Sequence, residues 1–396
     1  HTRDRRQRQM CIRDRYLTID DLKNEARKKV PKAFHDYVLS GSWTESTLRD
    51  NSNDFKKISF RQRVAVDISN RITRKSLLGT DYKMPVALAP VGLLGMQKAN
   101  GEILAAQAAE SFGVPFTLST MSICSIEEVA RNTSKPFWFQ LYVMRDHDFA
   151  KRLVERAKAA ECSALVLTLD LQILGQRHAD IRNGLSVPIK IKMANVFDLI
   201  SKPNWCFEMA RSKNRTFGNI MGHVKDIKNL TSLTKWVQSQ FDPKLNWDDV
   251  KRIKDWWGGK LIIKGIMDPD DAKMAQKCGA DALVVSNHGG RQLDGVNSSI
   301  STLPQIKKAV SDIDVLFDGG ISSGQDILKA IALGAEGVMI GRSFVYGLSA
   351  GGKEGVTKSL EILNKELDMT MALCGRRDIK DVGRDIIKDC PFFEKN

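Results

Sequence analysis

The stretch ALVVSNHGGRQLDG, residues 282–295, carries the clearest signal in the chain and sets how the rest is interpreted. Its first four residues are a short apolar run, typical of a buried strand, and small, polar and basic residues follow at once. His288 is the natural proton acceptor among them, because its ordinary pKa lies close to neutrality. Arg291 offers a planar pair of donors that suits a carboxylate, and Gly289 and Gly290 let backbone approach a ligand closely. The stretch therefore predicts a strand that opens into an active site, or else a strand-to-helix turn with one incidental histidine.

Short apolar runs of this kind recur along the chain, and helical patterns follow them. The runs are continuously apolar and do not alternate, as expected for strands buried on both faces. Eight such units favour an α/β fold, a (β/α)8 TIM barrel, over a doubly wound sheet. We expect the strands within residues 85–91, 115–120, 137–143, 164–170, 261–265, 282–289, 314–320 and 337–342.

Polar side chains collect at the carboxyl ends of these runs, where a TIM barrel carries its catalytic residues. The set is Gln140, Tyr142, Thr168, Asp170, Lys264, Ser286, His288, Asp318 and Arg342. Asp170 could orient and stabilise a protonated His288, or instead form an ion pair with an arginine. Lys264 could stabilise negative charge on a cofactor, or be a salt-bridged core residue.

The last two runs end in Asp318-Gly319-Gly320 and Gly341-Arg342. Loops at these places in a TIM barrel often bind phosphate through backbone N–H groups and a helix N-terminus, and Arg342 could clamp it. The alternative is that the glycines only make tight turns. Since the G-x-G-x-x-G fingerprint of a nicotinamide-binding unit is absent, the phosphate predicts flavin mononucleotide (FMN) as the cofactor.

The region 171–247 is too long for an ordinary connection between the fourth and fifth units. Near its start lies Arg177, which together with Arg291 could hold one carboxylate. Lys190, Lys192 and Lys202 are interleaved with apolar residues there, as suits an anionic bilayer surface. A lid, a membrane contact or an insertion packed on the barrel are the alternatives. Tyr37 and Tyr142 could donate hydrogen bonds to a substrate, although a lone tyrosine is more often a packing residue.

Composition excludes several classes of function. No run of 18 apolar residues is present, so no membrane-spanning helix is expected. The net charge of +14 is spread along the chain without interleaved aromatic residues, which disfavours nucleic acid and favours an anionic small molecule or membrane surface. The seven cysteines form no C-x-x-C pair, so a reducing cytoplasm is the default location, and no histidine or carboxylate cluster suggests a metal.

The sequence also predicts a division of the chain. Residues 1–15 read as a disordered or non-native basic arm, whose deletion should leave folding and activity intact. Residues 16–84 form an N-terminal helical segment packed on the barrel, with Thr18 capping one helix and Pro31 starting another that closes at Gly41. The barrel spans 85–385, and 386–396 is a C-terminal tail.

From about residue 17 to 385 the chain resembles the FMN-dependent L-2-hydroxy acid oxidising family. SNHGGRQLDG at 286–295 matches the family's active-site signature, and APVGLLGM (89–96), FTLSTMSICSIEEVA (116–130), WFQLYV (138–143), IIKG (262–265), FDGG (317–320) and IGR (340–342) support it. The segments around 89–96 and 116–130, with FGNI and FDPKLNWDDV in the insertion, are most similar to bacterial respiratory lactate dehydrogenases.

The resemblance implies a role for each matched residue. His288 is implied to be the base with Asp170 as its partner, Arg177 and Arg291 to hold the substrate carboxylate, and Tyr37 and Tyr142 to contact the substrate. Flavin-ring contacts are implied for Ser119, Gln140, Thr168 and Lys264, along with backbone around Ala89 and Gly92, and Ser286 is counted among the cofactor-binding residues. Ribityl and phosphate contacts are implied for Asp318, Gly319, Gly320, Gly341 and Arg342.

The activity implied by the resemblance is oxidation of an L-2-hydroxy acid, foremost L-lactate to pyruvate, with electrons passed to a quinone or cytochrome. An oxidase that uses oxygen, a dehydrogenase for glycolate, mandelate or a longer acid, a flavin-dependent isomerase and a non-catalytic sensor are the alternatives. A homotetramer, cytoplasmic and peripheral on the membrane, is implied as well. Two positions depart from the family: Ser322 replaces a common arginine, so FMN is expected to be held less tightly, and Gln172 replaces a common proline.

Overall fold

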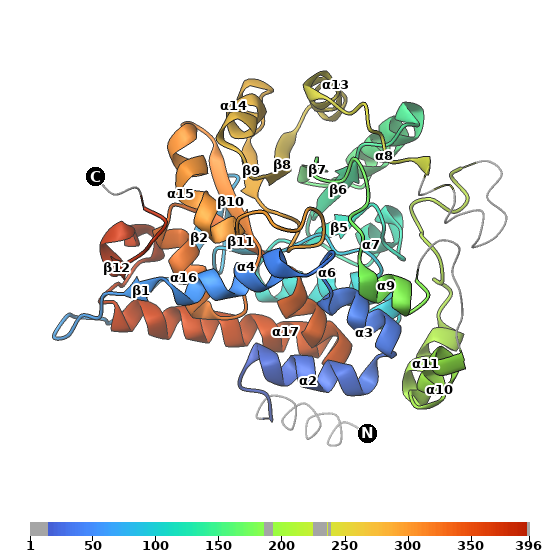
Figure 1. Cartoon of the computed structure of the whole chain (residues 1–396), viewed down its shortest axis with the longest axis horizontal. Helices are drawn as coiled ribbons and strands as arrows, with labels where there is room; N and C mark the ends of the chain where they lie inside the picture. Colours follow the sequence, from blue (N-terminus) through green and yellow to red (C-terminus); the bar gives the residue numbers. More distant parts are fainter. Residues whose placement is uncertain (1–14, 186–192, 225–235, 237–238, 394–396) are drawn as a thin grey trace.

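The computed structural model describes residues 15–185, 193–224, 236 and 239–393. These residues form an eight-stranded parallel sheet in the order β4-β11-β10-β9-β8-β7-β6-β5, and a bridge between Leu88 and Phe116 joins its first and last strands into a barrel (Figure 1). The prediction of a (β/α)8 TIM barrel is confirmed. The strands are β4 (Val86–Leu88), β5 (Thr117–Ser119), β6 (Trp138–Tyr142), β7 (Ala164–Thr168), β8 (Lys260–Ile266), β9 (Ala282–Val285), β10 (Asp314–Asp318) and β11 (Gly337–Ile340).

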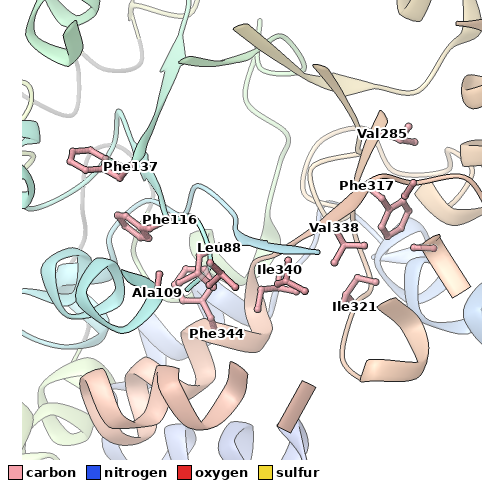
Figure 2. Packing of buried hydrophobic residues seen from close by; sticks show 14 of the residues in the cluster. Leu88, Ala109, Phe116, Phe137, Val285, Phe317, Ile321, Val338, Ile340 and Phe344 are labelled. Carbon is pink, nitrogen blue, oxygen red and sulfur yellow. The ribbon is translucent and has the colours of Figure 1, made fainter. Parts of the chain in front are cut away.

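Barrel strands are buried on both faces, which explains why their sequences are continuously apolar. Alternate residues point to opposite faces of the sheet. In β9, Ala282 and Val284 belong to a compact inner cluster, whereas Leu283 and Val285 belong to the large cluster between sheet and helices. Figure 2 shows this outer cluster, in which Leu88, Ile340 and Phe344 lie close together.

Helices follow the strands and cover the outside of the barrel. They are α5 (Leu94–Gln97), α6 (Gly101–Phe112), α7 (Ile126–Arg131), α8 (His147–Ala159), α13 (Trp247–Trp257), α14 (Pro269–Lys277), α15 (Ser299–Ala309), α16 (Gly324–Ala332) and α17 (Arg342–Leu373). Capping boxes at Ser125 and Asn246 begin α7 and α13. The long α17 bends at Gly351 and Gly352, whose backbone is not helical.

The N-terminal segment covers one end of the barrel. It contains α2 (Ile19–Lys29), α3 (Lys32–Leu39) and α4 (Ser46–Lys56), and Thr18 caps α2 as the sequence predicts. The helix α2 packs along α17 (Figure 1). A hairpin of β2 (Lys75–Leu77) and β3 (Thr80–Tyr82) follows, and Leu77 joins the inner cluster of the barrel.

The end of the described chain returns to this segment. After two short 3-10 helices, η1 (Ile379–Asp381) and η2 (Arg384–Ile386), β12 (Ile387–Asp389) pairs antiparallel with β1 (Ser59–Phe60). Part of the predicted C-terminal tail is therefore a strand. The predicted basic arm, except for Arg15, lies outside the described residues.

The insertion after β7 contains α9 (His178–Arg182), α10 (Met193–Ile200) and α11 (Pro203–Arg211). Figure 1 shows α10 and α11 beside α3 at the edge of the molecule. The backbone N–H of Lys32 donates to Asp198 at 2.5 Å, and the rings of Phe34 and Trp205 stack with centroids 5.5 Å apart. These contacts fix both helices to α3. Lys190 and Lys192, predicted to face a bilayer, lie outside the described residues.

Candidate active site

A cavity of about 1030 Å³ lies at the carboxyl ends of the barrel strands, under α3, α4 and the insertion. Its size is at the upper end of the range for small-molecule sites, roughly 300–1,000 Å³. Predicted site residues that line it are Tyr37, Ala89, Gly92, Ser119, Tyr142, Thr168, Arg177, Lys264, His288, Arg291, Asp318, Gly319, Gly320, Gly341 and Arg342. The fold thus brings together residues that span more than three hundred positions of sequence.

Three further predicted residues do not line the cavity but contact residues that do. Asp170 contacts His288, Gln140 contacts Ser119, and Ser286 contacts Lys264 and Asp318. Ser286 is fully buried, and its hydroxyl hydrogen-bonds to the side chains of Lys264 and Asp318.

His288 is held by Asp170 at the end of β9. Nδ1 of His288 lies 2.8 Å from Oδ1 of Asp170, and the backbone N–H of His288 donates to Oγ of Ser286 at 3.1 Å. Gly265 makes room for this pair, because a Cβ there would lie 2.8 Å from Asp170. Burial opposes the charged carboxylate, but His288 and Lys264 hold the pKa of Asp170 below its usual value. With Nδ1 engaged, Nε2 is the ring nitrogen left to exchange a proton with a bound molecule.

Two arginines flank Tyr37 in the same cavity. The guanidinium carbons of Arg291 and Arg177 lie 4.7 and 5.9 Å from the centre of the Tyr37 ring. Arg291 donates to the carbonyls of Tyr37 and Ser40, at 2.6 and 2.8 Å. Burial, reinforced by the nearby charge of Arg177, lowers the pKa of Arg291 to about 10. Two part-buried like charges against the same ring favour an anion, and a carboxylate matches guanidinium geometry.

Lys264 is a buried cation near the carboxyl end of β8, and it lines the cavity. Its Nζ lies 2.9 Å from Oγ of Ser286 and 2.9 Å from Oδ2 of Asp318, and the Ser286 hydroxyl donates to the same Asp318 oxygen at 2.8 Å. Burial opposes the charge, but Asp318 and Asp170 raise the pKa of Lys264. The lysine therefore stays protonated at neutral pH.

The polar atoms near Lys264 suit the edge of a flavin ring. Oγ of Ser119 donates to Oε1 of Gln140 at 3.0 Å. Among the described residues, Nε2 of Gln140 and Oγ1 of Thr168 are buried and have no hydrogen-bond partner. Buried donors of this kind rarely stay unpaired, so they fit a ligand with carbonyl and ring-nitrogen acceptors.

The far end of the cavity is built from glycine and a helix N-terminus. Gly319 and Gly320 have φ of 120° and 80°, and a Cβ on Gly320 would lie 2.0 Å from the carbonyl oxygen of Asn51. Ser323 caps α16, while the N–H and Oγ of Ser322 bond to Asp326 at 3.0 and 3.2 Å. The guanidinium of Arg342 donates to the carbonyls of Val38 and Ser40, at 2.9 and 3.2 Å. Backbone N–H groups and a fixed arginine at one end suit a phosphate.

Sequence reasoning missed the contacts that anchor the signature turn. Asn51 and Asn287 exchange two amide hydrogen bonds of 2.8 and 2.9 Å, and Oδ1 of Asn287 also accepts from the N–H of Gly290. Asp180, three residues after Arg177, bonds to that arginine. Only the Arg177-Asp180 spacing could have been found beforehand, since it matches one helical turn. In the described ranges, no three His, Cys, Asp or Glu side chains are grouped so as to hold a metal.

Fold and cavity together define a flavin-dependent oxidoreductase built on a TIM barrel. A model of the family described as FMN-dependent dehydrogenase matches residues 26–389, and the chain belongs to this family. FMN is therefore its cofactor, and the unpaired donors and glycine-lined end described above fit that molecule.

Named relatives cover nearly the whole chain. L-lactate dehydrogenases of Actinobacillus pleuropneumoniae serotype 5b (strain L20) and Haemophilus influenzae (strain PittEE) are each 45% identical over 374 residues, 94% of this chain and 98% of theirs. The solved monotopic membrane protein (S)-mandelate dehydrogenase has a TM-score of 0.90 at 33% identity, covering 94% of this chain and 99% of that one. Mandelate oxidase with (S)-2-phenylpropionate gives 0.79 at 33% identity, covering 94% and 98%.

Proposed function

We propose that the protein oxidises L-lactate to pyruvate with bound FMN and passes the electrons to a quinone or cytochrome. The observation that carries the proposal is the His288–Asp170 pair, with its 2.8 Å contact, beside the cavity that Arg177 and Arg291 also line. A base beside an anion site is what oxidation of a hydroxy acid requires. The relatives named L-lactate dehydrogenase support lactate as the acid.

In this proposal the protein's own groups bind the acid and move its proton. Arg177 and Arg291 hold the carboxylate, while Tyr37 and Tyr142 donate hydrogen bonds to it or to the reacting oxygen. His288 takes a proton from the substrate at Nε2, and Asp170 stabilises the protonated ring. Burial, with Asp170 nearby, raises the pKa of Tyr142, so its hydroxyl stays a donor at neutral pH. Bound FMN supplies the two-electron acceptor for this chemistry.

We also propose how the chain holds FMN. Lys264 stabilises negative charge at one edge of the ring, and the ring's other contacts come from Ala89, Gly92, Ser119, Gln140 and Thr168, with Ser286 holding Lys264 in place. The ribityl and phosphate groups lie against Asp318, Gly319, Gly320, Gly341 and Arg342. Support comes from the unpaired hydroxyl of Thr168 on the cavity wall, the unpaired amide of Gln140 behind Ser119, and the glycine backbone at the other end.

The test is flavin reduction without oxygen. Mixing the purified protein with L-lactate anaerobically should bleach the flavin absorbance, and D-lactate should not. The His288→Gln variant should keep FMN and lose bleaching by at least about 100-fold, the lower range for removal of a general base. His147→Gln, at the start of α8, is the matched control and should behave as the parent. Substantial bleaching by His288→Gln would refute the assignment.

A second candidate substrate is an aromatic hydroxy acid, favoured by the mandelate enzymes among the structural relatives. The cavity wall supports this alternative through Met121, Phe217 and Phe241. Comparing L-lactate and (S)-mandelate as anaerobic reductants separates the two. Hydrogen peroxide formation in air would instead identify an oxidase.

We further propose that the protein is cytoplasmic and binds peripherally to the inner face of the cytoplasmic membrane. No helix of the described residues is long and apolar enough to cross a bilayer. However, Phe197, Ile200 and Phe207 on α10 and α11 are 69%, 69% and 60% exposed, and Arg211 stacks on Phe207. Exposed apolar and basic groups on two neighbouring helices suit an anionic lipid interface. A homotetramer is proposed as well, and light scattering of the purified protein tests it.

A further inference from the structure

We propose that Asp180 is a positioning residue, which holds Arg177 in the orientation that binds the substrate carboxylate. The inference rests on the proposed function, because it concerns the carboxylate site of that reaction. It explains why the negatively charged Asp180 lies beside the site that is proposed to bind the substrate carboxylate.

The contact itself fixes the arginine. Nε of Arg177 lies 2.6 Å from Oδ2 of Asp180, at the start of the short helix α9. Because Nε is engaged, only the two terminal nitrogens of the guanidinium remain for a ligand. The ring of Tyr37 lies 5.9 Å from the guanidinium carbon on another side. One contact through Nε and one against a ring face restrict how the flexible side chain can turn.

Because the Arg177–Asp180 ion pair is largely buried, stabilising the fold is a poor explanation for it on its own. The side chains of Arg177 and Asp180 are only 17% and 11% exposed. Among the described residues, Oδ1 of Asp180 is buried without a hydrogen-bond partner. A buried ion pair gains little net stability, and an unpaired buried oxygen adds a further cost. The arrangement is therefore better explained by what it does for Arg177.

The charge of Asp180 acts in two opposite directions on an anionic substrate. It repels the incoming carboxylate, since both are negative and both lie near Arg177. It also balances the repulsion between Arg177 and Arg291, which share the ring of Tyr37. We infer that ordering of Arg177 dominates, because a free arginine side chain loses much rotational entropy when it is fixed by a ligand.

The direct test is Asp180→Asn in the FMN-loaded enzyme. KM for L-lactate should rise about 10-fold or more, the change expected when one charged hydrogen bond is lost, while kcat changes by less than about threefold. Oxalate, a dicarboxylate, serves as a second probe of the carboxylate site. Its dissociation constant, measured from the change in absorbance of bound FMN, should rise by a similar factor. Asp270→Asn, which removes an exposed carboxylate with the same three-residue spacing to its partner Lys273, is the matched control.

A double variant separates positioning from a general effect on the fold. In an Arg177→Met background, Asp180→Asn should not weaken oxalate binding further, because the residue to be positioned is gone. The same weakening in both backgrounds would overturn the proposal. Tighter oxalate binding by Asp180→Asn would also overturn it and would mean that repulsion dominates.

Two readouts keep the inference apart from the proposed function. If the parent enzyme binds oxalate but L-lactate does not bleach its flavin, the proposed function fails while the oxalate comparison still tests Asp180. If Asp180→Asn loses FMN, comparison of Arg177→Met with the double variant decides instead. Retention of FMN and equal oxalate affinity in those two proteins would support positioning, and weaker binding in the double variant would contradict it.

Discussion

Lys264 keeps a positive charge where water is excluded, and its carboxylate partner makes this possible. Nζ of Lys264 lies 2.9 Å from Asp318, and both side chains are buried. Lys264→Met would leave Asp318 charged and without its cation. We expect unfolding free energy to fall by about 3–5 kcal/mol, measured by urea unfolding of the FMN-free proteins. Lys264→Met/Asp318→Asn should recover much of the loss, whereas an equal loss in both variants would show that the pair is not the cause.

The Lys264–Asp318 pair also predicts how the stability of the protein changes with pH. The pKa of Lys264 is raised above 10.5, its value in an unfolded chain. Its contribution to stability is therefore fully present below 10.5 and lost as the pH rises through the higher folded value. The difference in unfolding free energy between the parent and Lys264→Met should stay constant from pH 7 to about 9.5 and shrink above about 10.5. A difference that grows with rising pH would contradict this assignment.

At the scale of elements, the turn after β10 depends on backbone that only glycine accepts easily. Gly320 has φ of 80°, and a Cβ there would overlap the carbonyl oxygen of Asn51 in α4. Gly320→Ala should cost about 1–3 kcal/mol of stability and weaken FMN retention, measured by urea unfolding and by flavin content after dialysis. Gly258→Ala is the control, because its φ of 67° is similar but no atom lies within 4 Å of the added Cβ. Equal losses of stability in the two variants would mean that the positive φ, and not the overlap with Asn51, causes the loss.

The neighbouring loop carries the departure from the family at Ser322. Its hydroxyl and N–H bond to Asp326 at the start of α16, so it adds no positive charge to the predicted phosphate end. Ser322→Arg should tighten FMN binding by about 10-fold or more, as expected for one added charged hydrogen bond to phosphate. Titration of FMN-free protein with FMN measures this, with riboflavin as the control ligand, since it has no phosphate. An equal gain for riboflavin would contradict a phosphate contact.

How far sequence predicts structure differs between these elements. Runs such as 282–285 are apolar throughout because both faces are buried, and this alone predicts the barrel strands. The hairpin of β2 and β3 and the pairing of β1 with β12 escaped prediction, because their strands have two or three residues and no readable period. Asn51 was missed for a different reason: its partner Asn287 is 236 positions away, and no local pattern marks such a pair. His288 and Arg291 were predictable because one short stretch carries both.

At the scale of the whole molecule, the neighbouring helices α10 and α11 of the insertion carry exposed apolar side chains. Changing Phe197, Ile200 and Phe207 together to Ser should reduce co-sedimentation with vesicles of anionic lipid by about 10-fold or more, since each buried side chain contributes roughly 1.5–3 kcal/mol. Flavin reduction by L-lactate in solution should be unchanged. Leu373→Ser, at an exposed position ending α17, is the control. Unchanged sedimentation of the triple variant would contradict a membrane contact through α10 and α11.

The helix α17 has a consequence that reaches across the molecule. It starts at Arg342 on the cavity, packs along α2, and bends at Gly351 and Gly352. Arg342 also donates to the carbonyls of Val38 and Ser40 at the end of α3. A ligand that restrains Arg342 is thus linked to the docking of the N-terminal helices. Removing FMN should expose α2 and α3 to proteolysis well before the barrel strands, so the cleavage pattern of the N-terminal segment becomes a direct gauge of cofactor occupancy.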